Sequence, residues 1–323
     1  MTHRFLGGVA GICLTTLLLL TPASGQTSHR DSWQKRTPDG QPDMEGYWSY
    51  ATITPFERPA ALAGKAFLTE EEAAKMEEGA RNRGRGTQRE GDVGAELWTD
   101  PGTRVVKTRQ TSLVVDPPDG RVPLTAAAEA RRDYNRAHET DSYQYMSVWD
   151  RCITRGVPAG MFPAGHNNAY QIIQTPGKVI IVSEMIHDAR VIPVDGSPHP
   201  PANVRLWDGD SRGHWEGNTL VVDTTNFNGK GSIATSAVQG RIKGVPQTEA
   251  LHVVERFTRT DAETLNYEVT IDDPPMYSQP WKVAIPLDRD ENYQMYEYAC
   301  HEGNTAVELI LGGGRAHDRE PSK

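Results

Sequence analysis

The stretch Leu265-Asn266-Tyr267-Glu268-Val269-Thr270-Ile271 decides the fold class of this protein, because it alternates strictly between apolar and polar residues. Successive side chains of a β-strand point to opposite faces, so the pattern predicts a strand with one buried face and one solvated face. A second strand-like run covers 252–259, and the polar turn Thr260-Asp261-Ala262-Glu263 separates the two runs. Together they predict an antiparallel hairpin.

The same strand–turn rhythm continues on both sides of this hairpin. Helical crossovers of about 10–15 residues do not interleave the runs, which disfavours a parallel sheet. We therefore predict a mainly β protein, folded as an antiparallel β-barrel or strongly curved sheet, with one or two helices in its N-terminal part. The helices are expected after the capping box at Thr69 and over 125–138. Further strands are expected at 46–53, 111–115, 171–174, 179–186, 190–194, 213–216, 219–224, 281–286 and 293–299.

The N-terminus has the pattern of a secretory signal peptide over residues 1–25. Arg4 precedes an apolar run, and Ala23-Ser24-Gly25 supplies small residues before a cleavage site. A membrane anchor is the alternative, but the run is short of the roughly 20 apolar residues that a span needs. We predict a periplasmic or secreted protein without stable membrane insertion after cleavage. Residues 26–45 are expected to form a loose polar leader and 46–323 a single β-rich domain.

The composition narrows the partners and the redox chemistry. The chain has 323 residues, with 34 basic and 43 acidic side chains and a net charge of −9, which argues against nucleic-acid binding. Outside the signal segment two cysteines remain, and an oxidising compartment favours a disulfide between Cys152 and Cys300. The alternative is a nucleophilic Cys300 beside His301, but adjacent strand residues point to opposite faces. Gly312-Gly313-Gly314 is expected to lie in a flexible tail.

Familiar catalytic motifs such as G-x-S-x-G, a Walker loop or H-E-x-x-H are missing from the sequence. Polar residues gather instead near the ends of predicted strands, where the mouth of a barrel would bring them together. The expected catalytic residues are His252 and His301 as acid or base, Glu184 as their carboxylate partner and Arg190 as a substrate-orienting group. The expected substrate-binding residues are His166, Asp223, Asn226 and His214.

Several of these residues also have a structural interpretation. Glu184 and Arg190 could form a cross-strand ion pair. Asp223 and Asn226 could cap a turn, and His187-Asp188 could form a hairpin tip. No cofactor is predicted. A divalent metal held by His166, His252 and His301 is the less favoured alternative, because their spacing is not local.

Six segments resemble a family of secreted bacterial proteins that shares a G-x-W-E-G-[DN]-T-L-V-V hairpin motif. The resemblance implies a Gram-negative envelope setting and carries no catalytic residues. The strand rhythm is also similar to lipocalin-type barrels, by fold analogy alone. The six segments are residues 47–49, 54–59, 190–196, 213–222, 251–257 and 298–304.

These observations lead to one function hypothesis and two alternatives. The leading hypothesis is a periplasmic enzyme that performs cofactor-free general acid/base chemistry, of lyase, hydratase or hydrolase type, on a small organic molecule in a barrel cavity. The first alternative is a non-catalytic carrier of an apolar or sugar-like ligand. The second is a cell-envelope interaction protein.

Overall fold

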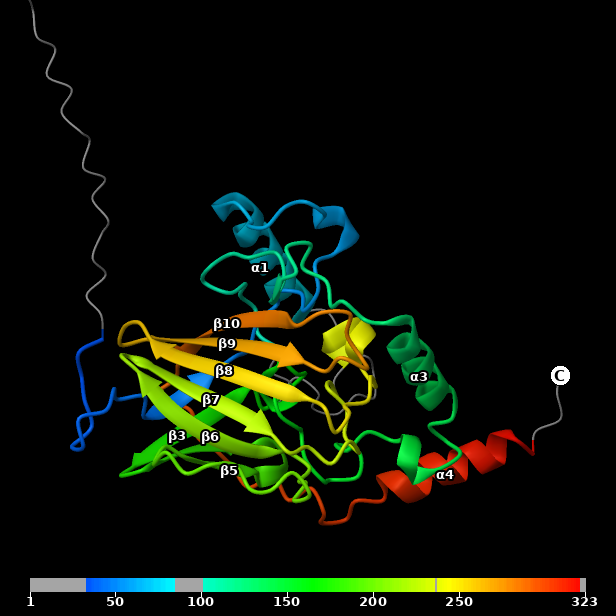
Figure 1. Cartoon of the computed structure of the whole chain (residues 1–323). Helices are drawn as coiled ribbons and strands as arrows, with labels where there is room; N and C mark the ends of the chain where they lie inside the picture. Colours follow the sequence, from blue (N-terminus) through cyan, green and yellow to red (C-terminus); the bar gives the residue numbers. More distant parts are fainter. Residues whose placement is uncertain (1–32, 85–100, 236, 320–323) are drawn as a thin grey trace, which may run out of the picture. The chain divides into compact units, whose positions relative to one another are not determined.

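The chain folds around one curved antiparallel sheet, seen in the computed structural model of residues 33–84, 101–235 and 237–319 (Figure 1). Nine strands pair in the order β5-β4-β3-β1-β10-β9-β8-β7-β6, and β2 pairs with β10 outside this path. The terminal strands β5 and β6 also contact each other, so the sheet is a nearly closed barrel. The strands are β1 (Gly46–Ser49), β2 (Val114–Asp116), β3 (Ala169–Thr175), β4 (Lys178–Ser183), β5 (Ala189–Pro193), β6 (Asp210–Glu216), β7 (Thr219–Thr225), β8 (His252–Arg259), β9 (Thr264–Asp272) and β10 (Trp281–Arg289).

Gly213 of β6 allows the barrel to close. A Cβ atom at this position would lie 2.8 Å from Val194 Cγ1 and 3.0 Å from Ile192 Cγ2. Because glycine has no side chain there, the apolar residues at the end of β5 can pack directly against the backbone of β6. The seam between β5 and β6 is therefore closed by packing rather than by a ladder of backbone hydrogen bonds.

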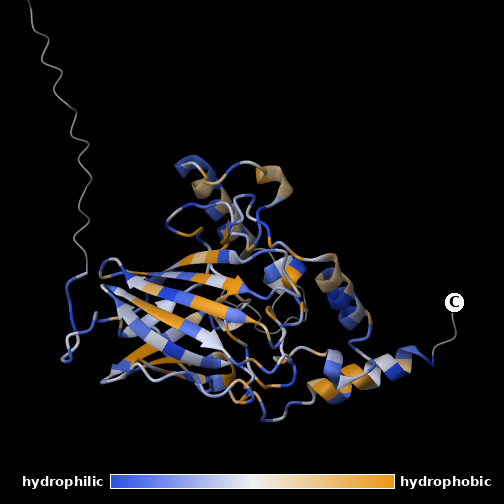
Figure 2. Cartoon of the chain, in the orientation of Figure 1, coloured by the Kyte–Doolittle hydropathy of each residue, from blue (hydrophilic) through white to orange (hydrophobic). Residues whose placement is uncertain are grey.

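The alternation of the hairpin is confirmed. The odd-numbered residues of β9 from Leu265 to Ile271 are buried, whereas Asn266, Glu268 and Thr270 are not. Strands β8 and β10 show the same pattern, with Phe257 and Trp281 buried in one common apolar core. Figure 2 shows the result as alternating orange and blue bands along the strands. The inner face of the barrel is thus filled by side chains.

Three α-helices lie in the described residues: α1 (Glu70–Gly84), α3 (Ala126–Ala137) and α4 (Ala306–His317). The first two were expected. The hydroxyl of Thr125 accepts a hydrogen bond from the Ala128 amide and caps α3. None of the described helices is long and apolar enough to cross a membrane.

Four expectations about the chain ends meet different outcomes. The predicted strand at 293–299 does not form, because side-chain contacts rather than a ladder hold this segment, as described below. The predicted flexible tail at 312–314 is wrong, since these glycines belong to α4, where Gly314 approaches Thr140 so closely that a Cβ atom would not fit. Residues 33–45 pack instead of forming a loose leader: Met44 is fully buried and the Arg259 guanidinium lies 3.8 Å from the Trp33 ring. The predicted signal peptide lies outside the described residues.

Candidate active site

A buried ion pair between Arg190 and Glu255 lies on the inner face of the barrel. Arg190 shares the inward face of β5 with Ile192. Glu255 is itself an inward-facing residue of β8, and its side chain is 0% exposed. Arg190 Nη2 donates to Glu255 Oε2, and a buried carboxylate needs such a partner. Arg190 was expected in the site, but with Glu184 rather than Glu255 as the nearby carboxylate.

Hydroxyl groups complete the hydrogen bonding of this pair. Arg190 Nε donates to Ser211 Oγ at 2.9 Å, and its Nη2 donates to Thr224 Oγ1 at 2.8 Å. The Tyr267 hydroxyl donates to Glu255 Oε1 at 3.1 Å, and burial raises the pKa of Tyr267 well above its ordinary value. The opposite charges of Arg190 and Glu255 balance inside the barrel, and their hydrogen bonds hold both side chains in fixed positions.

Two further carboxyl groups, those of Asp188 and Asp208, lie next to Arg190 at the end of the barrel. Asp188 directly precedes β5, and Asp208 lies two residues before β6, so both belong to the same edge of the sheet. The Thr154 hydroxyl lies 2.8 Å from Asp208 Oδ2 and 3.2 Å from Asp188 Oδ2. Burial and then the charge of Asp188 raise the pKa of Asp208 to about 7, against the opposing effects of Thr154 and Arg190. Near neutral pH a substantial fraction of Asp208 therefore carries a proton. Asp188 and Asp208 are here called the aspartate pair.

The aspartate pair borders a small cavity of about 50 Å³. This volume accommodates one or two water molecules, since a water occupies about 30 Å³ in the liquid. The walls combine hydrogen-bonding groups with apolar side chains. They include Thr154, Arg155, Val157, Met161, Tyr170, Ile181, Ser183, Asp188, Arg190 and Asp208.

The expected acid–base residue His252 lies on the outer face of the barrel instead. Its Nε2 is 2.7 Å from Asp223 Oδ2, and Asp223 Oδ1 is 3.1 Å from His199 Nε2. His199 Nδ1 in turn lies 2.7 Å from Asp210 Oδ2. The structure therefore unites His252 with Asp223, as a His–carboxylate pair, but on the surface and 43% exposed at His252. This outer chain joins the loop before β6 to strands β7 and β8.

Glu184 does not pair with His252, with His301 or with Arg190. This buried carboxylate accepts a hydrogen bond from the Tyr293 hydroxyl and another from the Tyr296 amide at 3.2 Å. The alternative cross-strand ion pair with Arg190 does not form, and Glu184 anchors the segment after β10. The reason is that Glu184 follows the last residue of β4 and faces this returning segment. The catalytic role of Glu184 stays a prediction.

The other expected residues are spread over the molecule. His301 is exposed and its side chain makes no hydrogen bond or ion pair within the described ranges, and His214 lies on the outer face at 3.1 Å from Glu216. Asn226 donates from Nδ2 to the carbonyls of Pro200, Pro201 and Val204, so its role is to hold a loop, as the turn-capping alternative anticipated.

His166 lies at the end of the barrel, half-buried between two aromatic rings. Its ring centroid is 6.0 Å from that of Trp149 and 6.4 Å from that of Tyr298. Burial and the charge of Arg155 lower the pKa of His166, while Glu184 opposes this change. His166 thus accompanies Glu184 in holding the end of the chain, and the substrate-binding role remains a prediction.

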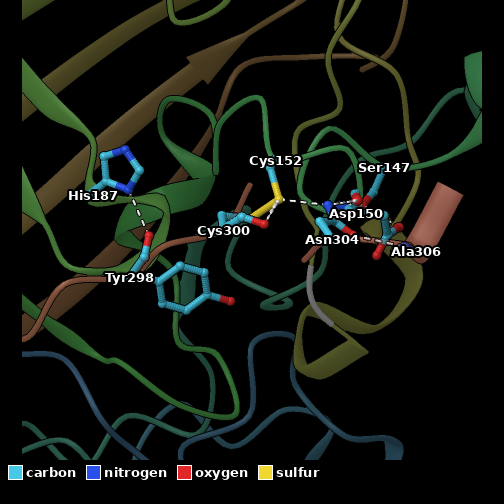
Figure 3. Close-up of a disulfide and its surroundings, with 8 residues drawn as sticks. All are labelled: Ser147, Asp150, Cys152, His187, Tyr298, Cys300, Asn304 and Ala306. Atoms are coloured by element: carbon cyan, nitrogen blue, oxygen red, sulfur yellow. Dashed lines mark hydrogen bonds between the residues drawn. A yellow bond between two sulfur atoms is a disulfide. The ribbon is translucent and has the colours of Figure 1, made fainter. Parts of the chain in front are cut away.

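The predicted disulfide between Cys152 and Cys300 is present, with a Cα–Cα distance of 5.6 Å (Figure 3). Nearby, His187 Nδ1 lies 2.7 Å from the Tyr298 carbonyl oxygen, and Asn304 Nδ2 donates to the Asp150 carbonyl at 3.3 Å. The bridge excludes the alternative of a nucleophilic Cys300, because a cysteine in a disulfide has no free thiolate. It ties the C-terminal segment to the residues just before Thr154.

Comparison with known proteins adds no further assignment. No family model, curated protein or solved structure matches this chain. The candidate site therefore rests on its own geometry. The described ranges contain no group of three or more His, Cys, Asp or Glu residues arranged to hold a metal ion.

Thr154 and Asp208 were not predicted as site residues, and Asp188 was expected at a hairpin tip. A signal was available, because Asp188 and Asp208 both lie just before strands, close to the position of His252 at the start of β8. Which strand-end residue faces inward depends on the pairing of distant strands, and Thr154 lies in a loop whose path the disulfide directs.

Proposed function

We propose that this protein is an exported enzyme that performs cofactor-free general acid–base chemistry with water at the aspartate pair. The observation that carries the proposal is the pairing of Asp188 with Asp208, whose pKa is raised to about 7, on the wall of a water-sized cavity. A raised carboxyl pKa in a cavity, with a specific charged neighbour, is typical of an acid–base site. The disulfide and the signal-like N-terminus support export.

The geometry supports a hydrolase or hydratase reaction. In a hydrolysis, the ionised aspartate of the pair would take a proton from a cavity water as the water oxygen bonds to the substrate. The protonated aspartate would give its proton to the leaving group as that bond breaks, so the pair ends with one proton as it began. Arg190 lies beside the pair and would stabilise negative charge that develops on the substrate.

The carrier alternative requires an apolar cavity along the barrel. The inner face instead carries Phe257, Trp281 and other residues of one packed core, together with the Arg190–Glu255 pair. This arrangement favours chemistry at the end of the barrel over storage of a ligand within it.

The protonation of the aspartate pair can be measured without a substrate. In ¹³C NMR titration of the side-chain carboxyl groups, we expect one resonance to titrate near pH 7, and Asp188→Asn to lower that pKa. Titration of both aspartates near their ordinary pKa of about 4 would contradict the proposal.

Activity provides the second test. We expect a panel of chromogenic esters, glycosides and phosphates to reveal turnover that Asp208→Asn reduces by about 100-fold or more. His252→Gln, on the outer face, serves as the matched control and should keep the activity. Turnover that survives Asp188→Asn and Asp208→Asn together would place the chemistry elsewhere.

A further inference from the structure

A second, larger cavity lies outside the barrel and differs in character from the first. Its volume is about 570 Å³, within the range of small-molecule sites, and it shares no lining residue with the cavity at the aspartate pair. Its walls come from α3, from residues 143–151 and from the loop between β7 and β8. Five cations line it, namely Arg131, Arg136, Arg151, Lys230 and Lys243, against one acid, Glu139. We call it the cationic groove.

The cations that line the groove outnumber its acids, five to one. None of the five cations forms an ion pair within the described ranges, although the chain as a whole carries a net charge of −9. The nearby Arg132 and Arg241 are different, since they pair with Asp133 and Glu129. Because unpaired cations in one concave surface attract anions, the groove is complementary to a ligand with several negative charges.

Arg151 gives the groove a specific recognition element. Its guanidinium carbon lies 6.0 Å from the Tyr143 ring centroid and 5.7 Å from the Trp207 ring centroid, so two aromatic rings hold it. Burial lowers the pKa of Arg151. Its Nε is buried and has no hydrogen-bond partner among the described residues. A buried donor without a partner is costly, and a bound acceptor would remove that cost.

A second buried atom of the groove, a side-chain oxygen, is a hydrogen-bond acceptor without a donor among the described residues. Asn135 Oδ1 on α3 is also buried without a hydrogen-bond partner in the described part of the chain. A carbonyl oxygen accepts from hydroxyl or N–H groups. The groove thus combines several cations, exposed aromatic surface at Tyr143, which is 53% exposed, and an acceptor for a hydroxyl group. An anionic sugar chain presents the matching carboxylate or sulfate groups, ring faces and hydroxyls.

The walls of the groove are held in place before any ligand binds. Gly244 has a φ of +81°, and a Cβ there would lie 3.6 Å from Arg136 Cγ, so the loop and α3 pack closely. On the other side, the disulfide at Cys152 and the bond from Asn304 fix the residues around Arg151. A site with fixed walls binds with less loss of conformational entropy.

We propose that the cationic groove binds an acidic oligosaccharide, with Arg151 and Lys243 contacting its anionic groups. This inference is independent of the proposed function, because binding can be measured without turnover. It adds a ligand class and a second site to the protein.

The test is titration calorimetry with the full mature chain. The probes are tetragalacturonate and a sulfated heparin tetrasaccharide, with cellotetraose as the uncharged control. We expect one acidic probe to bind with a micromolar Kd that weakens in high salt, and cellotetraose not to bind. We expect Arg151→Gln with Lys243→Gln to weaken binding by 10-fold or more. The matched control Arg256→Gln, on the outer face of the barrel, should bind as the wild type does.

Arg131→Gln protects the test against loss of folding, because Arg131 is exposed and its replacement should weaken binding by a few fold without changing the unfolding midpoint. The proposal is overturned if neither acidic tetrasaccharide binds, if the groove variants bind as tightly as Arg256→Gln does, or if cellotetraose binds equally well. Loss of activity in Asp208→Asn with unchanged binding would leave the groove assignment intact.

Discussion

Replacing Arg190 with methionine tests whether the buried ion pair is as important to folding as its geometry indicates. The change removes the hydrogen bonds from Arg190 to Ser211, Thr224 and Glu255 while keeping an apolar chain inside the barrel. Glu255, which is 0% exposed, would keep the Tyr267 hydroxyl as its described donor. Leaving a buried charge without its partner costs about 3–5 kcal/mol of unfolding free energy.

The double variant Arg190→Met with Glu255→Leu separates the charge from the packing. With both charges gone, Ser211 and Thr224 can still bond to each other at 3.1 Å, but the Tyr267 hydroxyl loses its acceptor. One buried hydroxyl without a partner costs about 1–3 kcal/mol. We therefore expect the double variant to be more stable than Arg190→Met alone, by roughly 2 kcal/mol.

Urea unfolding followed by tryptophan fluorescence measures these differences, and thermal unfolding provides a second reading. For a domain of this size each kcal/mol shifts the Tm by about 2–4 °C, so Arg190→Met should lower the Tm by about 10 °C. An exposed ion pair contributes up to about 1 kcal/mol. The reasoning is refuted if Arg190→Met lowers the unfolding free energy by less than about this amount, or if the double variant is less stable than Arg190→Met.

Three further perturbations follow from the structure. Because the pKa of Asp208 is raised to about 7, the folded state binds more protons than the unfolded state between about pH 4 and pH 7; stability should therefore fall as pH rises through this window, and urea unfolding of Asp208→Asn should show a smaller fall. Replacing Cys152 and Cys300 with serine should cost about 5 kcal/mol in the chain-entropy model, given the separation of 148 residues, and peptide mapping before and after reduction should detect the bridge. Gly314→Val should release α4, since a Cβ would lie 2.5 Å from Thr140 Cβ, and hydrogen exchange should then increase in α4 while the barrel strands stay protected.

The local sequence pattern was sufficient to predict the strands that have one buried face and one solvated face. The alternation in β9 predicted both its position and its buried residues, because a strand carries its own two-residue period, and the strand-like run at 252–259 predicted the position of β8. The segment 293–299 has similar aromatic content but forms no strand. Strand β1, which pairs with β10, already pairs with β3 on its other edge, so the returning chain finds no free neighbour there and is held by Glu184 instead.

The candidate site was only partly predictable, and the reason lies in the curvature of the sheet. Arg190 was predicted as a site residue, but the strands of Arg190 and Glu255 are six positions apart along the sheet order, and the two side chains meet only across the interior of the barrel. No local pattern encodes that contact. Asp188 and Asp208 line the inner cavity at one end of the barrel, whereas His252 and Asp223 lie on the outer face.

The two candidate sites are built from the same two short segments. In the first segment, Arg151 lines the cationic groove and Thr154 lines the cavity of the aspartate pair, with Cys152 between them. In the second segment, Trp207 lines the groove and Asp208 lines the cavity. Arg151 and Thr154 are three residues apart in the sequence. The disulfide at Cys152, which lies between them, therefore positions the walls of both cavities. A ligand that moved Arg151 and Trp207 would act directly on the segments that hold the aspartate pair. Any coupling between the sites would need no path through the barrel core, because the two shared segments connect them directly.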